Sequence, residues 1–175
     1  MGDFCRFVDW RFVHRARLNL VPQNGSFSWR TGNRRCRRCG HTIESLAYVV
    51  NHCMQYTSLY MARHNALVAR LKKVAERKFT VISENQVIGP QCLRLDLVLR
   101  RGNATLIIDA TVPFDNRLKA FRDSVDEKLS KYEELRKEIA ADVSSEVSID
   151  PFIVGSLGSW DPANDALAKQ LTPSC

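Results

Sequence analysis

The sequence predicts an α+β fold in which a mixed β-sheet is flanked by helices and preceded by a small cysteine-containing module. Three observations support this class. Alternating apolar and polar residues mark strands in the middle of the chain, helical periodicity marks long segments around them, and a Cys-Arg-Arg-Cys motif precedes both. The length of 175 residues suits one domain with a small satellite. We divide the chain into a basic N-terminal segment with the cysteines, residues 1–56, and a core domain, residues 57–175.

The expected elements follow the order β-β-β-α-β-α after the first long helix. They are a short helix within 10–22, a turn-rich stretch over 22–33, a helix over 57–78, strands over 79–88, 93–100 and 104–112, a helix over 115–141, a strand over 147–154 and a helix ending at 171. Asp161 and Pro162 predict the N-cap and first position of that last helix.

Composition and charge indicate an anionic partner. The net charge is +7, which favours nucleic acid first and an acidic membrane second. No apolar run approaches the roughly 18 residues of a membrane span, and Asp3 and Asp9 argue against a signal peptide, so we expect no membrane and a reducing compartment.

A run of arginines precedes and surrounds the Cys-Arg-Arg-Cys motif. They are Arg30, Arg34, Arg35, Arg37 and Arg38. Such a run is either a solvated basic loop or a set of phosphate contacts, and its place beside a cysteine pair favours phosphate.

Two aspartates occupy neighbouring strands. In LRLDLVLR, the four leucines share one face and Asp96 lies on the opposite one. In ATLIIDATV, Asp109 shares its face with Ile107, opposite the face of Leu106 and Ile108. A two-residue Gly102-Asn103 loop would place position 96 directly across from position 109. Opposed carboxylates repel each other unless a divalent cation or a shared proton lies between them, and oxygen ligands suit magnesium or manganese. A single exposed aspartate at a strand end is the alternative.

A lysine of the long helix is predicted to face this pair. The apolar stripe of the helix comprises Leu118, Phe121, Val125, Leu129, Tyr132, Leu135 and Ile139. At about 100° per residue, Lys128 falls within roughly 40° of the stripe's centre and Lys131 about 100° from it. Lys128 would therefore meet the carboxylates or extend its ammonium to water. Two carboxylates, a cation and a lysine are components for phosphodiester hydrolysis.

The cysteine segment predicts a structural zinc site. Cys36 and Cys39 form a short-loop pair, and His52 and Cys53 complete four nitrogen and sulfur ligands. Cys5, Cys92 and Cys175 have no partner at a ligand spacing.

Together these motifs resemble a known family. The strings CRRCGHTIESLAYVVNHC, ARHNALV, RLDLVL, LIIDATVPF, EKLSKY and GSLGSWDPAND resemble, in order, the C-terminal region of site-specific non-LTR retrotransposon polyproteins that carry a restriction-like endonuclease. The resemblance implies a PD-(D/E)xK nuclease fold, a preceding zinc knuckle, and nicking of double-stranded target DNA to prime reverse transcription. It further implies a nuclear location, element RNA as a partner, and a reverse transcriptase domain elsewhere in the polyprotein.

The resemblance also assigns residues. The two acids of the family match Asp96 and Asp109. The family's helix motif matches Lys128, Lys131 and Tyr132, and its DNA-contact signature matches Arg63, His64 and Asn65. Three positions depart from the family pattern: Leu95 stands where proline is usual, Thr111 where many nucleases hold lysine, and Tyr48 where the knuckle has histidine. For Tyr48, either His52 or else His41 replaces the ligand, or zinc is bound weakly. The alternative function is a zinc-containing DNA- or RNA-binding module with an inactive nuclease-like core, or a structural module that contacts partner proteins.

Overall fold

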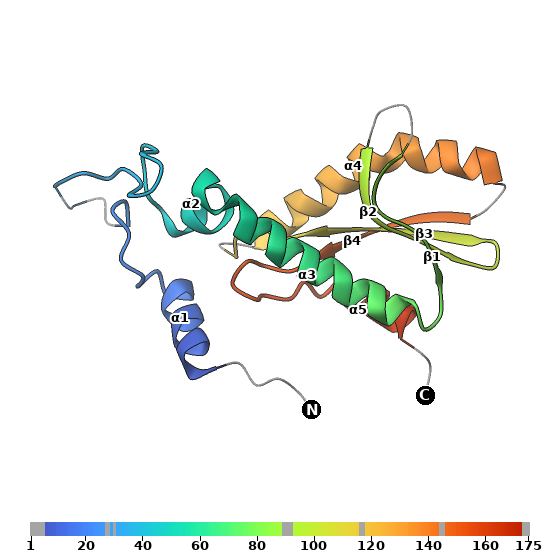
Figure 1. The fold of residues 1–175 in the computed structure, drawn as a ribbon, viewed down its shortest axis with the longest axis horizontal. Helices are drawn as coiled ribbons and strands as arrows, with labels where there is room; N and C mark the ends of the chain where they lie inside the picture. Colours follow the sequence, from blue (N-terminus) through green and yellow to red (C-terminus); the bar gives the residue numbers. More distant parts are fainter. Residues whose placement is uncertain are drawn as a thin grey trace.

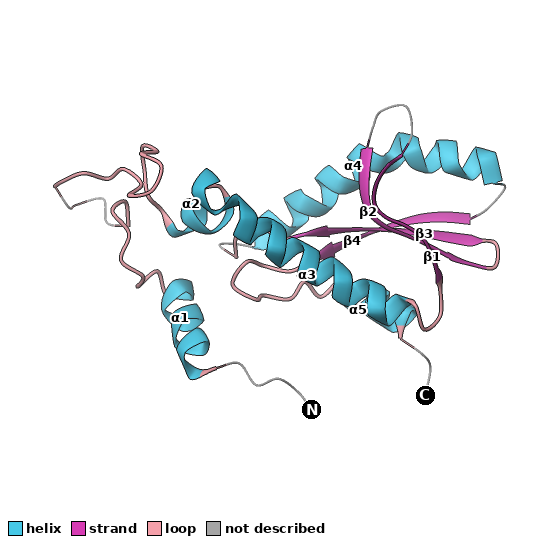
Figure 2. Cartoon of the chain, in the orientation of Figure 1, coloured by secondary structure: helices cyan, strands magenta, loops and turns pink. Residues whose placement is uncertain are grey.

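The computed structural model describes residues 6–26, 29, 31–88, 93–115, 118–143 and 146–172. Its elements in chain order are α1 (Phe7–Arg17), α2 (Leu46–Asn51), the short 3-10 helix η1 (Met54–Tyr56), α3 (Thr57–Ala75), β1 (Thr80–Ile88), β2 (Leu93–Arg101), β3 (Ala104–Thr111), α4 (Leu118–Val143), β4 (Glu146–Ile153) and α5 (Asn164–Leu171). The predicted α+β class and the order after α3 are confirmed, and Figure 2 shows the helices around the strands. The three cysteines without a ligand spacing, Cys5, Cys92 and Cys175, and also Arg30, lie outside the described residues.

The four strands form one mixed sheet in the order β1-β2-β3-β4. The first three are antiparallel neighbours, whereas β4 runs parallel to β3. A parallel neighbour needs a crossover connection, and α4 supplies it. Figure 1 shows α4 along one face of the sheet and α3 with α5 on the other. The sheet is therefore the middle layer of three.

The apolar residues separate into a core on each face of the sheet. On the α3 and α5 side, Val68 and Leu71 pack against β-strand residues that include Leu97 and Ile108. On the α4 side the core is smaller, and in it the fully buried Tyr132 packs among residues from β2, β3 and β4. Leu129, predicted in the apolar stripe of α4, is instead 41% exposed, because the core on this side does not extend to it.

The β2–β3 hairpin has the predicted two-residue loop. Arg101 pairs with Ala104, and the register continues to Leu97 opposite Ile108. Gly102 has φ +58°, the left-handed value that the first loop position of a tight hairpin favours. The ladder stops there, one step before Asp96 and Asp109 would pair.

The alternation of β2 breaks at the same place. Leu97 and Leu99 face the α3 side, but Leu95 packs with Tyr132 on the α4 side, so the predicted common face of these leucines is wrong at Leu95. Asn85 of the neighbouring strand has φ +53°, and the β1–β2 pairing skips the step between Asn85 and Asp96. An irregularity of this kind re-aims a side chain.

Two helix starts differ from the predictions. Helix α1 begins at Phe7, several residues before the predicted segment. Helix α5 begins at Asn164, and Asp161 does not act as its N-cap. The Asp161 carboxylate instead accepts a hydrogen bond from Ala163 N at 2.9 Å, so a turn precedes the helix. Among the described helices, none is long and apolar enough to cross a membrane.

A third apolar cluster joins the N-terminal segment to the core domain. Ala16 of α1, Leu46 of α2 and Leu157 of the loop after β4 are its buried members. Asp115 holds that loop, because its carboxylate oxygens accept hydrogen bonds from Leu157 N and Ser159 N, each at 3.1 Å. A Cβ atom at Gly155 would overlap the Asp115 carboxylate, so this close approach requires glycine.

The buried side chain of Asn164 attaches α5 to the end of β4. Its amide accepts a hydrogen bond from Ile153 N at 3.0 Å and donates one to Ile153 O at 2.6 Å. We predict that Asn164→Ala lowers the free energy of unfolding by about 2–4 kcal/mol, because it leaves two buried backbone groups unpaired. Urea denaturation measures the change, and Gln170→Ala, exposed on the same helix, is the control. Equal stability of the two variants would contradict the prediction.

Candidate active site and cysteine cluster

Asp109 is a buried carboxylate on β3, 3% exposed. The Tyr132 hydroxyl of α4 donates a hydrogen bond to its Oδ1 at 2.7 Å. The Lys128 ammonium lies 2.7 Å from its Oδ2 as an ion pair, and this oxygen accepts no hydrogen bond of good geometry from the described residues. The buried Asp109 carboxylate is thus compensated from α4 by one hydrogen bond and one ion pair.

Lys128 is the lysine of α4 that reaches the sheet, as the helical periodicity predicted. Its side chain is 19% exposed. Lys131 is exposed, yet its ammonium lies 3.2 Å from the Tyr132 hydroxyl and 4.8 Å from the centre of that ring. Four of the five predicted catalytic side chains, namely Asp109, Lys128, Lys131 and Tyr132, are therefore neighbours.

Tyr132 connects the two carboxylate-bearing strands. Besides its bond to Asp109, its hydroxyl lies 3.2 Å from the carbonyl oxygen of Arg94 on β2. Burial raises the pKa of Tyr132 strongly, and the hydrogen bond to Asp109 and the charges of both aspartates add to the shift. The phenol consequently stays protonated and acts as a hydrogen-bond donor.

Asp96 has its contacts on the other side of the sheet. Its Oδ2 accepts a hydrogen bond from Ala110 N at 2.7 Å and lies 3.1 Å from His64 Nε2 of α3. The Ala110 carbonyl oxygen is 3.2 Å from the same nitrogen, so Nε2 faces two acceptors and carries a proton. The pKa of His64 is raised, chiefly by the hydrogen bond with Asp96.

The two aspartates therefore do not face each other as equivalent partners on one side. Asp109 is held by α4, and Asp96 is held by α3 and by the backbone of β3. The predicted register was right up to Leu97, but the ladder ends before Asp96 and the side chain takes the place of a backbone acceptor. A period-two pattern cannot reveal such a break.

A cleft of about 310 Å³ opens beside Asp96. Its lining includes His64, Asn65 and Tyr60 of α3, and Arg94 of β2. Of the predicted signature, His64 thus contacts an acid and Asn65 is exposed at the cleft. Arg63 is half-buried, and its guanidinium donates to Asn51 Oδ1 at 3.1 Å, which joins α3 to the end of α2.

The acidic site has the chemistry of a divalent-cation site. Two buried carboxylates offer hard oxygen ligands, and the Lys128 ammonium lies 2.7 Å from Asp109 Oδ2. Asp96 and Asp109 do not, however, belong to a compact group of three protein ligands in that part of the chain. Magnesium typically keeps several waters and takes one or two carboxylates, so each aspartate offers the type of ligand that it takes.

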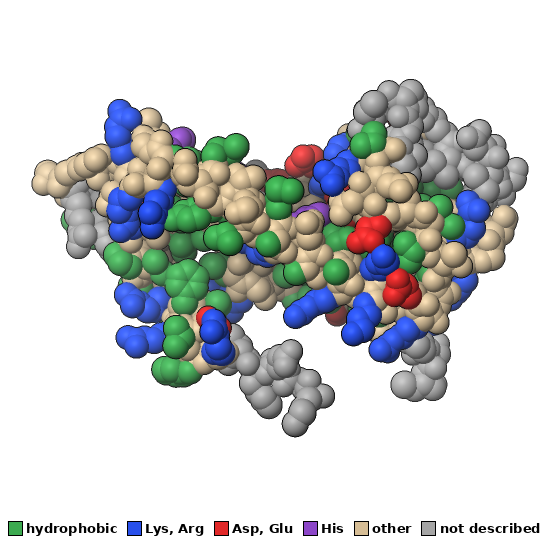
Figure 3. Space-filling model, viewed as in Figure 1, with side chains coloured by type: hydrophobic (Ala, Val, Ile, Leu, Met, Phe, Trp, Pro, Cys, Tyr) green, Lys and Arg blue, Asp and Glu red, His purple; other side chains and the backbone are tan. Residues whose placement is uncertain are grey.

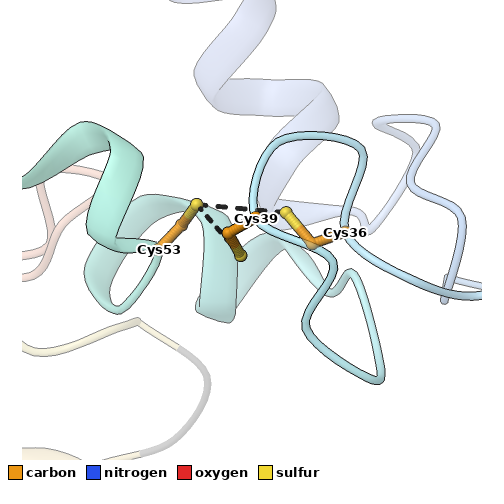
Figure 4. A group of neighbouring side chains, drawn as sticks. All are labelled: Cys36, Cys39 and Cys53. Carbon is orange, nitrogen blue, oxygen red and sulfur yellow. Dashed lines mark hydrogen bonds between the residues drawn. The ribbon is translucent and has the colours of Figure 1, made fainter.

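The cysteine module contains a group of three thiols that could hold a metal ion, formed by Cys36, Cys39 and Cys53 (Figure 4). Cys53 Sγ lies 3.9 Å from Cys36 Sγ and 3.7 Å from Cys39 Sγ. Sulfurs of a tetrahedral zinc site lie roughly 3.8 Å apart, given a zinc–sulfur distance of about 2.3 Å. The three thiols are therefore already spaced for zinc.

Neither predicted histidine joins these thiols. His52 is exposed and lies outside the group, as does His41, whose ring instead stacks on Tyr48 at 4.0 Å with an interplanar angle of 8°. His52 as the fourth zinc ligand therefore stays a prediction, because it lies outside this group of three thiols. The side chain that reaches the thiols is Tyr48, whose hydroxyl is 2.9 Å from Cys39 Sγ. This hydrogen bond, with smaller contributions from the His41 backbone and the other two thiols, lowers the pKa of the Cys39 thiol to about 7.

Sequence reasoning also missed Glu44, which organises the arginine-rich loop. Its carboxylate is 2% exposed and accepts hydrogen bonds from Asn24 N, Arg37 N and Arg37 Nε at 2.8, 3.1 and 3.0 Å. Burial raises the pKa of Glu44, but these bonds outweigh burial and hold the pKa below its ordinary value. Arg37 is therefore part of the fold of the loop. Arg38 donates to the Tyr56 hydroxyl and Arg35 to the Gly40 carbonyl, while Arg34 is half-buried.

The Tyr132 hydroxyl provides a test of the buried contact. We predict that Tyr132→Phe lowers the free energy of unfolding by about 1–3 kcal/mol, because Asp109 loses a buried hydrogen bond to a charged group. Tyr56→Phe removes a hydroxyl that contacts an exposed arginine and is the control. Chemical denaturation of both variants measures the difference, and equal losses would contradict a special role for Tyr132.

The His64–Asp96 contact predicts a pH dependence. Because the pKa of His64 is raised in the folded state, its contribution to stability is complete below its ordinary value near 6.5 and disappears as pH rises through the folded-state pKa. The stability difference between wild type and His64→Asn should shrink as pH rises from the ordinary pKa of about 6.5 through the raised folded-state pKa of His64. Denaturant titrations at several pH values measure it, with the exposed His14→Asn as control. A difference that grows with pH would refute the contact.

Comparison with known proteins places the chain near a retrotransposon polyprotein. No protein-family model matches the chain. Its sequence is 24% identical over 178 residues to the retrovirus-related Pol polyprotein from type-1 retrotransposable element R2 of Popillia japonica. The match covers 98% of this chain and 37% of that polyprotein, so the chain spans little more than a third of the length of this curated relative. The similarity supports a retrotransposon-related role for the chain.

Proposed function

We propose that this chain is a divalent-metal-dependent endodeoxyribonuclease domain of the PD-(D/E)xK kind. The observation that carries the proposal is the buried Asp109 carboxylate, which lies 2.7 Å from both the Lys128 ammonium and the Tyr132 hydroxyl. The four-stranded mixed sheet with helices on both faces supports the same proposal.

In this proposal, each residue has a distinct role. Asp96 and Asp109 hold the cation, magnesium or manganese, and Lys128 orients the attacking water or stabilises the charge that develops on the phosphate. Tyr132 orients the Asp109 carboxylate through its hydrogen bond. The Lys131 ammonium, next to the Tyr132 hydroxyl, would neutralise a phosphate bound at the site. When bound, the cation would polarise the phosphate and acidify a water ligand.

Double-stranded DNA is the proposed substrate. Figure 3 shows Lys and Arg side chains over the N-terminal module and also along the α3 side of the core. We propose that phosphates are contacted by Arg34, Arg35 and Arg38 and, at the cleft, by His64 and Asn65. Arg37 and Arg63 would instead stabilise this surface through their hydrogen bonds to Glu44 and Asn51. The net charge of +7 suits such contacts.

The similarity to a retrotransposon polyprotein supports a role of this activity in retrotransposition. We propose that the nick serves to prime reverse transcription, which occurs on chromosomal DNA in the nucleus. The reverse transcriptase would be a further domain of the same polyprotein, and element RNA a further partner. The zinc-holding module, residues 1–56, would dock on DNA beside the nuclease domain.

A second function is favoured by one observation. Asp96 Oδ2 already accepts the Ala110 N–H and contacts His64, which competes with metal binding at that oxygen. On this ground the chain would be a zinc-containing DNA- or RNA-binding module with an inactive core. It would bind nucleic acid in a salt-sensitive manner and would not cut it.

Nicking of supercoiled plasmid in magnesium or manganese distinguishes the two functions. For the nuclease, Asp109→Asn and Lys128→Gln should each reduce the nicking rate by at least about 100-fold, because both act at the reacting phosphate. Asp126→Asn and Lys137→Gln change the same charges at exposed positions of α4 and are matched controls.

The outcomes separate clearly. Retention of DNA binding by Asp109→Asn together with loss of nicking would support the nuclease. Metal-dependent nicking that is equal in wild type and Asp109→Asn would refute the site. Salt-sensitive binding by wild type without any nicking in either metal would select the binding module.

A further inference from the structure

The position of Tyr48 in the cysteine module leads to a separate inference. Cys36 and Cys53 are buried and Cys39 is exposed, and the three thiols form the one group of three or more such ligands in the described part of the chain. A structural zinc site requires four ligands. The fourth position is therefore the open chemical question of this module.

The backbone brings Tyr48 to the thiols. Ser45 caps α2 by accepting a hydrogen bond from Tyr48 N at 3.2 Å. At the other end of this short helix, the Tyr48 carbonyl oxygen accepts from both His52 N at 2.8 Å and Cys53 N at 2.9 Å. These hydrogen bonds fix the backbone of Cys53 next to the backbone of Tyr48.

The Tyr48 ring is also held in its orientation. His41 stacks on it nearly in parallel, and the hydroxyl ends 2.9 Å from Cys39 Sγ. The His41 ring thus stacks face to face on the Tyr48 ring, and His41 is not a member of the ligand group. His52 is exposed at the C-terminal end of α2. Within the described residues, the Tyr48 oxygen is the non-sulfur side-chain atom that reaches the thiols.

We propose that the metal site of this module consists of the Cys36, Cys39 and Cys53 thiolates with the Tyr48 hydroxyl as its fourth ligand. A phenol is a weaker donor for zinc than an imidazole, whereas thiolates are soft ligands. The three thiolates therefore supply most of the affinity. The site consequently favours softer thiophilic cations such as Cd²⁺ over Zn²⁺ more strongly than the same site would with histidine.

Metal binding to the whole chain tests the proposal independently of DNA cleavage. Cobalt titration reports sulfur ligation by charge-transfer absorption and the complete ligand set by the visible bands, and competition with a chelator gives zinc and cadmium affinities. Tyr48→Phe keeps the ring that stacks on His41 and removes only the oxygen, and circular dichroism confirms that each variant is folded. Tyr48→His supplies an imidazole in place of the phenol.

The expected results are specific to Tyr48. Tyr48→Phe should shift the visible cobalt bands and weaken zinc binding by a few-fold, with the sulfur bands retained. Tyr48→His should tighten zinc binding by about 10-fold or more and lower the ratio of cadmium to zinc affinity, since an added imidazole favours zinc. His52→Ala and His41→Ala should leave the sulfur bands unchanged, and His52→Ala should also leave zinc affinity unchanged.

Two results would overturn the proposal. The first is a Tyr48→Phe variant with the cobalt spectrum and zinc affinity of wild type, which would remove the phenol from the ligand set. The second is a loss of zinc affinity in His52→Ala as large as that in Cys53→Ser, which would make His52 the fourth ligand. Neither result depends on whether the chain cuts DNA.

Discussion

The burial of the Asp109 carboxylate under α4 is the constraint on which the arrangement of the core domain depends. An ionised group taken out of water costs several kcal/mol unless charge and hydrogen bonds compensate it. Lys128 and Tyr132 provide both from adjacent turns of one helix, so the phase of α4 on the sheet is tied to Asp109. Because α4 is also the crossover between β3 and β4, the same contact sets the parallel edge of the sheet.

The second aspartate reveals how the opposite face is tied to the same site. Asp96 lies where the β2–β3 ladder ends, and its carboxylate accepts the Ala110 N–H that a regular ladder would leave to the backbone. His64 reaches it from α3. Each helical layer thus contacts one carboxylate of the sheet, α3 through Asp96 and α4 through Asp109. The irregular strand is stable here because the Asp96 carboxylate replaces the missing backbone acceptor.

The N-terminal module follows a different design. Its fold depends on Glu44 and on the three thiols more than on apolar packing, since several large apolar residues of α1 are exposed, including Phe7 at 71% and Val8 at 73%. A small segment with little core commonly relies on a metal ion for stability. Leu157 and Asp115 then attach this module to the core domain, so the loop after β4 joins the two parts.

The sequence by itself determined the α+β class, the order of the elements, the two-residue hairpin loop, the choice of Lys128 over Lys131, and the three cysteines. These features depend on periodicity and short spacings, which are local. The break at Asp96, the turn of Leu95 toward α4, the contact of His64 with Asp96 and the approach of Tyr48 to Cys39 were decided only by the tertiary structure. Each joins segments far apart in sequence or departs from a regular period, because a carboxylate or a thiol takes the partner that packing brings to it.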